Sequence, residues 1–230
     1  MNADYIKKSE FWSCMMLLGL HCVLFPIVVG VLALTLTLPL ELSESEWNLA
    51  YYAVSFALTL IMLGGFLRRS FDTLIENIFL CIKYFLFGWG LYYILNLAAA
   101  ALLSGIEFLN AANPNDDTVS ELVKTQGGAM KAAAVFLAPV VEEVIFRGGL
   151  FCSVRRKNRV LAYALSITLF ALYHCWQYAL TYMDLRYLLF MLQYIPAGFV
   201  LCWCYDKSGS IWTSIFFHMS VNMLGVLALA

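Results

Sequence analysis

The most constraining feature of this chain is a series of apolar runs of twenty or more residues without a charge. A helix of about 20 apolar residues is long enough to cross roughly 30 Å of hydrocarbon. Of the 230 residues, 63% are apolar and 13% are charged, whereas a soluble domain is about half apolar and about one quarter charged. One water-soluble core could not bury this excess. The sequence therefore predicts an all-α, polytopic membrane helical bundle.

Hydropathy predicts about seven transmembrane helices. They cover approximately residues 11–39, 48–67, 76–104, 129–152, 160–182, 187–205 and 210–230. The first run is too long for the core of a signal peptide, so we expect it to remain as the first span. Pro26 and Pro139 are expected to kink their helices. Because no stretch could build a separate soluble unit, residues 1–230 are expected to form a single membrane domain.

Lysine and arginine gather on one side when these spans are threaded alternately through the membrane. With the N-terminus inside, the inner side holds Lys7, Lys8, Arg68, Arg69, Arg155, Arg156, Lys157, Arg159 and Lys207. The outer side holds Lys124, Lys131 and Arg186. Since cytoplasmic loops carry the excess of basic residues, an N-inside orientation is predicted. Residues 105–128, rich in Asn, Asp, Pro and Gly, are expected to form a partly disordered outer loop.

The charge balance and the cysteines limit the partners and cofactors. With 14 Lys and Arg against 15 Asp and Glu, no overall basic field indicates a nucleic-acid partner. The seven cysteines lack the paired spacing of a zinc site and are expected to be free, packed thiols. No cofactor is therefore expected, and membrane lipid is the expected surrounding.

Three ionisable residues interrupt the apolar sequence of the fourth predicted span. An ionisable group in hydrocarbon costs several kcal/mol, so each needs a partner or a function. Glu143 and Arg147 are four residues apart, in the favourable order for an ion pair on one helix face. Glu142 lies about 140° away from Arg147 around the helix, given 3.6 residues per turn. The spacing predicts one neutralised carboxylate, Glu143, and one available carboxylate, Glu142.

Two later spans supply further polar residues with a four-residue spacing. His174 follows Phe170, and His218 precedes Asn222. At about 1.5 Å per residue, Glu142, His174 and Asn222 lie roughly 20 to 22 Å from the nearest inner basic residues. His218 lies at roughly 16 Å on the same rise. Residues from three helices are therefore expected to meet at one level.

A cluster of this composition suits hydrolysis. A buried carboxylate beside a neutral imidazole can take a proton from water. A second imidazole and an amide N–H can then stabilise the oxyanion that develops on the attacked carbonyl. The sequence thus supplies both a general base and an oxyanion hole.

At these residues the chain resembles the CPBP family, which contains the CAAX prenyl proteases and the bacteriocin-processing (Abi) proteins. The EExxxR motif is Glu142, Glu143 and Arg147; the FxxxH motif is Phe170 and His174; the HxxxN motif is His218 and Asn222. Gly148 and the run KSGSIWTSI at 207–215 also match. The resemblance covers about residues 129–223, which are expected to form the catalytic core. Seven spans are predicted here, whereas CAAX proteases of this family have eight.

The resemblance implies a glutamate-dependent intramembrane endopeptidase. In that interpretation Glu142 and His174 activate water, His218 and Asn222 stabilise the oxyanion, and Glu143 and Arg147 organise the site. An older interpretation of such proteins is a zinc metalloprotease with Glu142, His174 and His218 as ligands. The spacing leaves zinc open, but the chain has no HExxH helix, which favours the metal-free mechanism.

Substrate and location are predicted only in general terms. The expected substrate is a membrane-associated peptide or small protein, such as a leader or signalling peptide or a prenylated CAAX-type tail. The expected location is a bacterial plasma membrane. Two alternative functions remain: a transporter or proton-coupled channel, because intramembrane Glu and His also relay protons, and a catalytically idle immunity or scaffold protein.

Overall fold

The computed structural model describes residues 6–40, 44–111, 113–125 and 127–228, and these residues are almost entirely helical. In the N-terminal half, the first helix runs through three segments without a break, and two long helices follow. These elements are α1 (Lys8–Gly19), η1 (Leu20–Leu24), α2 (Phe25–Leu40), α3 (Glu44–Glu76) and α4 (Ile78–Leu103).

The C-terminal half begins with two short elements, continues through a long helix of five successive segments, and ends with four further helical pieces before the last helix. In chain order these are η2 (Glu107–Asn110), α5 (Pro114–Thr125), α6 (Gly127–Ala132), η3 (Ala133–Leu137), α7 (Ala138–Glu143), η4 (Val144–Phe151), α8 (Cys152–Arg155), α9 (Arg159–Tyr173), α10 (Trp176–Thr181), η5 (Leu185–Phe190), α11 (Met191–Ser208) and α12 (Ile211–Ala228). The segments η1, η3 and η4 are π-helical, and η2 and η5 are 3-10 helices.

Five stretches among the described residues are long and apolar enough to cross a membrane. They are Lys8–Leu32, Glu46–Glu76, Ile78–Leu103, Leu185–Ser208 and Ile211–Ala228. The polytopic all-α bundle is therefore confirmed, and the protein is an integral membrane protein. The count of seven spans and the orientation of the N-terminus stay predictions.

Two predicted boundaries are wrong. The expected span 160–182 is not one helix, because α9 ends at Tyr173 and α10 begins only at Trp176, after a turn. The described part of the expected loop 105–128 contains η2 and α5. Pro114, at the start of α5, fits the preference of proline for the first helical turn.

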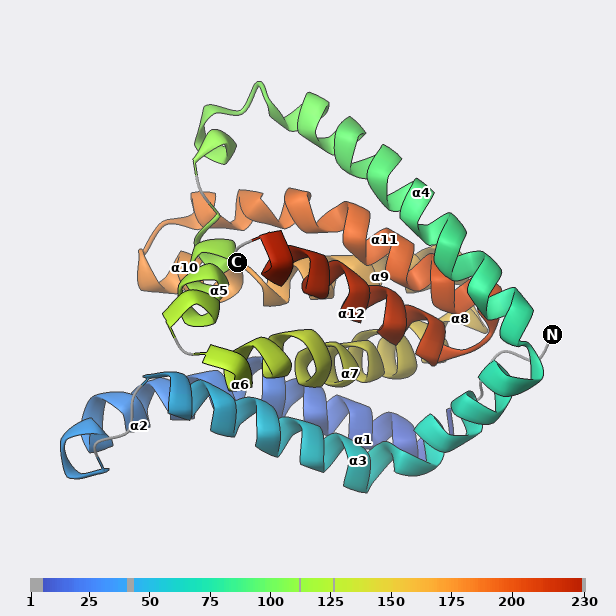
Figure 1. Ribbon diagram of the computed structural model, residues 1–230, viewed down its shortest axis with the longest axis horizontal. Coiled ribbons are helices and arrows are strands. Elements are labelled where there is room, and N and C mark those ends of the chain that lie inside the picture. The colour runs from blue at the N-terminus through green and yellow to red at the C-terminus, as the bar shows by residue number, and fades with distance from the viewer. Residues whose placement is uncertain (1–5, 41–43, 112, 126, 229–230) are drawn as a thin grey trace.

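The helices lie side by side in a bundle whose two ends differ (Figure 1). The beginning of α1, α8 and the beginning of α4 lie at one end. The other end holds α2, α5, α10 and the end of α12 (Figure 1). We call the latter the α5 end. The basic residues predicted to face inside belong to elements of the opposite end, so the order of the helices is compatible with alternate threading.

Each of the two prolines expected to cause kinks follows a π-helical segment. Before Pro26, the Phe25 N–H bonds to the Leu20 carbonyl, five residues back. Before Pro139, the Ala138 N–H bonds to the Ala133 carbonyl, again five residues back. The next N–H in that pattern would belong to the proline, which has none. The carbonyls of His21 and Ala134 are thereby left for partners on other helices.

Close approach of helices depends on three glycines. A Cβ on Gly149 would lie 2.6 Å from Cys14 Cβ, and one on Gly148 would lie 2.9 Å from the Phe66 ring. A Cβ on Gly88 would lie 2.8 Å from Cys204 Sγ. These contacts bring α1 and α3 against η4, and α4 against α11. All seven cysteines are free and buried, as predicted.

Candidate active site

Glu142 lies in the last turn of α7 with 5% of its surface exposed. Its Oε2 atom is 3.9 Å from Nε2 of His174 and 3.9 Å from Nε2 of His218. Within the part of the chain that the structure describes, this oxygen has no hydrogen-bond partner. A buried carboxylate oxygen thus faces two imidazoles that come from two other helices.

His174 stands at the C-terminal end of α9, where the helix stops. Its Nδ1 lies 2.8 Å from the carbonyl oxygen of Phe170, one turn earlier. A carbonyl only accepts hydrogen bonds, so Nδ1 carries the proton and the neutral ring keeps a lone pair on Nε2. The FxxxH spacing therefore aims an accepting nitrogen toward Glu142.

His218 is held by the second carboxylate. Its Nδ1 lies 2.9 Å from Glu143 Oε1, which also accepts a hydrogen bond from Arg147 Nη1 at 3.0 Å. The hydroxyl of Ser214 donates to the other oxygen of Glu143. The ion pair between Glu143 and Arg147 that their spacing predicts is present, and both side chains are fully buried. Glu143 therefore joins α7, η4 and α12 at one point.

Arg147 has further partners that compensate its burial. It donates to the Gly198 carbonyl of α11 at 3.2 Å, and its guanidinium lies 4.3 Å from the centre of the Phe170 ring. A buried charge needs such pairing, because its removal from water is otherwise costly. The arginine thus connects the carboxylate to the helix that carries His174.

Asn222 lies one turn beyond His218 on α12, about 6 Å further along the axis at the usual rise. Its Nδ2 donates to the carbonyl of Ala134 at 2.9 Å. This is the carbonyl that Pro139 leaves without an intrahelical partner. An amide nitrogen has two N–H groups, so one remains for another acceptor.

A cavity of about 1650 Å³ connects these residues. Glu142, His174, His218 and Asn222 all line it, whereas Glu143 and Arg147 do not. The remaining lining comes from both halves of the chain and contains many aromatic and polar side chains, including Tyr51, Tyr52, Trp89, Tyr92, Asn96, Asn113, Asp116 and Tyr194. The cavity is therefore enclosed partly by helices that precede the three motifs.

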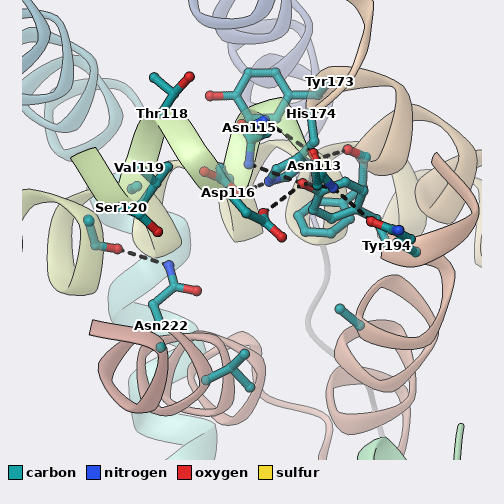
Figure 2. Close-up of a pocket in the computed structure, with 18 of the residues that line it drawn as sticks. Asn113, Asn115, Asp116, Thr118, Val119, Ser120, Tyr173, His174, Tyr194 and Asn222 are labelled. Carbon is teal, nitrogen blue, oxygen red and sulfur yellow. Dashed lines mark hydrogen bonds and ion pairs between the residues drawn. The ribbon is translucent and has the colours of Figure 1, made fainter. Parts of the chain in front are cut away.

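Several lining residues were not predicted. Figure 2 shows Asn113, Asn115 and Asp116 close to Tyr194 and His174. Asn113, Asn115 and Asp116 lie in the segment that was expected to be a loop, so no helical periodicity in the sequence indicated them. The role of Ser214 in binding Glu143 does have a sequence signal, because Ser214, His218 and Asn222 follow one another at four-residue intervals.

His21 has the interhelical hydrogen-bonding role expected of a buried histidine in a bundle. Its Nδ1 lies 2.9 Å from Ser55 Oγ, and its Nε2 lies 3.0 Å from the hydroxyls of Tyr51 and Tyr173. Tyr51 also donates to the His21 carbonyl at 3.1 Å, the carbonyl that Pro26 leaves unpaired. Tyr51 and Tyr173 of this cluster also line the cavity.

Among the described residues, no group of three or more His, Cys, Asp and Glu side chains is arranged to hold a metal ion. The zinc alternative remains open to a direct test.

Comparison with known proteins finds similarity in the motif-bearing segment. Residues 127–224 match the family described as "Type II CAAX prenyl endopeptidase Rce1-like". UPF0177 protein YxdF of Lactococcus lactis subsp. lactis (strain IL1403) is 30% identical over 89 residues. That stretch is 39% of this chain and 44% of the relative, so the chain spans less than half of the curated protein that it matches. No solved structure matches significantly. The segment 127–224, which is less than half of this integral membrane chain, is thus similar to the Rce1-like CAAX prenyl endopeptidases.

Proposed function

We propose that this protein is an intramembrane endopeptidase that hydrolyses a peptide bond with water activated by Glu142 and His174. The observation that carries the proposal is the position of the Glu142 carboxylate, 3.9 Å from each of two imidazole nitrogens in one cavity. Separations of this size between polar atoms are typically bridged by a water molecule. A water bound to Glu142 Oε2 and His174 Nε2 would be oriented by two acceptors.

The proposed reaction begins when this water attacks the carbonyl carbon of the scissile peptide. Its proton passes to Glu142 or to the lone pair of His174, and the carbonyl oxygen becomes an oxyanion. The C–N bond then breaks, the leaving amine takes up the transferred proton, and the carboxyl product remains. No group outside this chain and the water is needed to balance the step.

His218 and Asn222 are proposed to stabilise the oxyanion. Because His218 Nδ1 lies within hydrogen-bond distance of the Glu143 carboxylate, Nε2 is the ring nitrogen left to donate to the oxyanion when it carries a proton. The free N–H of Asn222 supplies the second donor. Glu143, Arg147 and Ser214 are proposed to hold His218 in position.

The proposed substrate is a membrane-associated peptide or the tail of a small protein. The Rce1-like family implies a peptide or prenylated protein as substrate and lipid as the surrounding. The aromatic and amide side chains of the cavity suit an apolar chain with peptide groups to be hydrogen-bonded. Leader peptides, signalling peptides and prenylated tails are the candidates, and a bacterial plasma membrane is the proposed location.

The test uses the purified full chain in detergent, incubated with prenylated C-terminal peptides and with leader peptides, and mass spectrometry of the products. Glu142→Gln should abolish cleavage without changing the size-exclusion profile. Glu76→Gln, at an exposed glutamate in the last turn of α3, is the matched control and should cleave like the wild type. Unchanged cleavage by Glu142→Gln would refute the proposal.

A further inference from the structure

Tyr194 of α11 covers one face of the His174 ring. The two rings are stacked, with centroids 4.5 Å apart and planes inclined by 25°. The Phe170 ring contacts the same imidazole at 4.6 Å with a tilt of 59°. Together with the hydrogen bond from Nδ1 to Phe170, these contacts leave the imidazole little freedom to rotate. These contacts are important for the orientation of the His174 ring, because His174 stands where α9 ends and its backbone is not within a continuous helix.

The hydroxyl of Tyr194 is fixed by the segment that leads into α5. It accepts hydrogen bonds from Asn113 Nδ2 at 3.0 Å and Asn115 Nδ2 at 3.1 Å, and it donates to Asp116 Oδ1 at 3.0 Å. A phenol oxygen that accepts two hydrogen bonds and donates one has no capacity left. The hydroxyl is therefore saturated by protein groups in the described structure (Figure 2).

The segment that holds Tyr194 is itself anchored to two other helices. Asn113 also donates to Gln193 Oε1 at 2.9 Å, and its side-chain oxygen accepts from the Asn115 backbone N–H at 3.1 Å. Further along α5, Thr118 accepts a hydrogen bond from Tyr178 of α10 at 3.1 Å. Because the amide groups of Asn113 are used within the protein, this cluster is built to hold a side chain rather than to bind a peptide.

We propose that Tyr194 is a positioning residue for His174, held in place through its hydroxyl by Asn113, Asn115 and Asp116. The ring fixes the plane of the imidazole, so that Nε2 points at the cavity beside Glu142. The start of α5 thereby becomes part of the catalytic arrangement, although none of its residues takes part in the chemistry. The structural part of this inference is independent of the proposed function, and only its kinetic consequence rests on peptide hydrolysis.

The structural part is tested by NMR on the full chain in detergent. The chain has three histidines, so 13C labelling of the histidine ring gives few resonances, and His→Gln variants assign them. Tyr194→Leu should remove the upfield ring-current shift of His174 and leave His218 unchanged. Tyr194→Phe should retain the shift. Tyr93→Leu, at a lipid-facing tyrosine that is 66% exposed, is the control.

The kinetic part uses a peptide that the wild type cleaves. Tyr194→Leu should lower kcat roughly tenfold to 100-fold with KM within about twofold, since misplacement of a catalytic group by about 1 Å costs up to roughly 100-fold. Tyr194→Phe removes the hydroxyl with its three hydrogen bonds but keeps the stacked ring, and it should lose about fivefold or less. Asp116→Ala removes one of these hydrogen bonds and should lose no more than Tyr194→Phe, and the double variant should equal Tyr194→Phe, because the carboxylate acts through the hydroxyl. Asp117→Ala, which removes the neighbouring carboxylate, should act like the wild type.

The outcomes separate the explanations. An unchanged His174 resonance in Tyr194→Leu would overturn the proposal, whether or not any peptide is cleaved. A rise in KM at constant kcat would overturn it in favour of direct substrate contact. If Tyr194→Leu fails to give monodisperse protein, Tyr194→Met decides, because it also lacks the aromatic ring and should remove the same shift of His174, whereas Asp117→Ala should not. Absence of hydrolysis by the wild type would count against the proposed function alone.

Discussion

Nδ1 of His218 lies 2.9 Å from Oε1 of Glu143, the carboxylate that also pairs with Arg147. The pair is fully buried, so its charge is not screened by water. Glu142, the adjacent residue, faces the other way, toward the cavity. Two consecutive glutamates thus have separate environments: Glu143 is surrounded by donors, and Glu142 has an oxygen without a hydrogen-bond partner among the described residues.

Arg147→Met should destabilise the protein strongly. Removal of one partner from a buried ion pair leaves the other charge uncompensated, at a cost of about 3 to 5 kcal/mol. The double variant Glu143→Gln, Arg147→Met should recover part of this loss, because no unpaired charge remains. Thermal unfolding in detergent measures both effects. A double variant less stable than Arg147→Met would contradict this account of Glu143.

Asn222→Ala should destabilise the protein by about 1 to 3 kcal/mol, since it leaves the Ala134 carbonyl without a donor. In a Pro139→Ala background, residue 139 regains an N–H that can reach this carbonyl. The same substitution of Asn222 should then cost about 0.5 kcal/mol or less, the range of an ordinary surface change. Equal losses in both backgrounds, measured by unfolding, would exclude the link between Pro139 and Asn222.

Gly149→Ala should cost about 1 to 3 kcal/mol by overpacking, because its Cβ would lie 2.6 Å from Cys14 Cβ. Cys14→Gly should relieve part of that strain in the double variant. Gly90→Ala serves as the control, since a Cβ there meets nothing within 4 Å. Similar unfolding temperatures for the two single variants would show that α1 does not pack on η4 as closely as described.

Prolonged dialysis against a chelator should leave peptide cleavage unchanged if Glu142 and His174 activate water without a metal. Mass spectrometry of the products and metal analysis of the same samples provide the measurement. Loss of cleavage that zinc restores, and that magnesium does not, would support the zinc alternative with Glu142, His174 and His218 as ligands.

The sequence predicts local relationships well in this chain. The apolar runs identify a membrane bundle, and the spacing of four residues identifies the Glu143–Arg147 pair. Both follow from the geometry of a single helix, which depends only on neighbouring residues. The role of His21 as an interhelical residue was likewise predictable from its burial in an apolar run.

Relationships between distant segments were not predictable. Tyr194 contacts Asn113 and Asn115, which are 81 and 79 residues away, and no periodic pattern connects them. The break of α9 at His174 was missed because the apolar run continues through Cys175 and Trp176. A hydropathy pattern reports only how apolar a segment is, whereas the end of α9 within this apolar run depends on tertiary contacts.

The cavity wall that faces Glu142 includes Tyr51 and Tyr52 of α3 and Trp89 and Tyr92 of α4, which lie outside residues 127–224. A fragment limited to the later helices would carry all three motifs and lack these four aromatic side chains of the cavity wall. The proposed hydrolysis would therefore require the helices that precede the motifs as well as the motifs themselves.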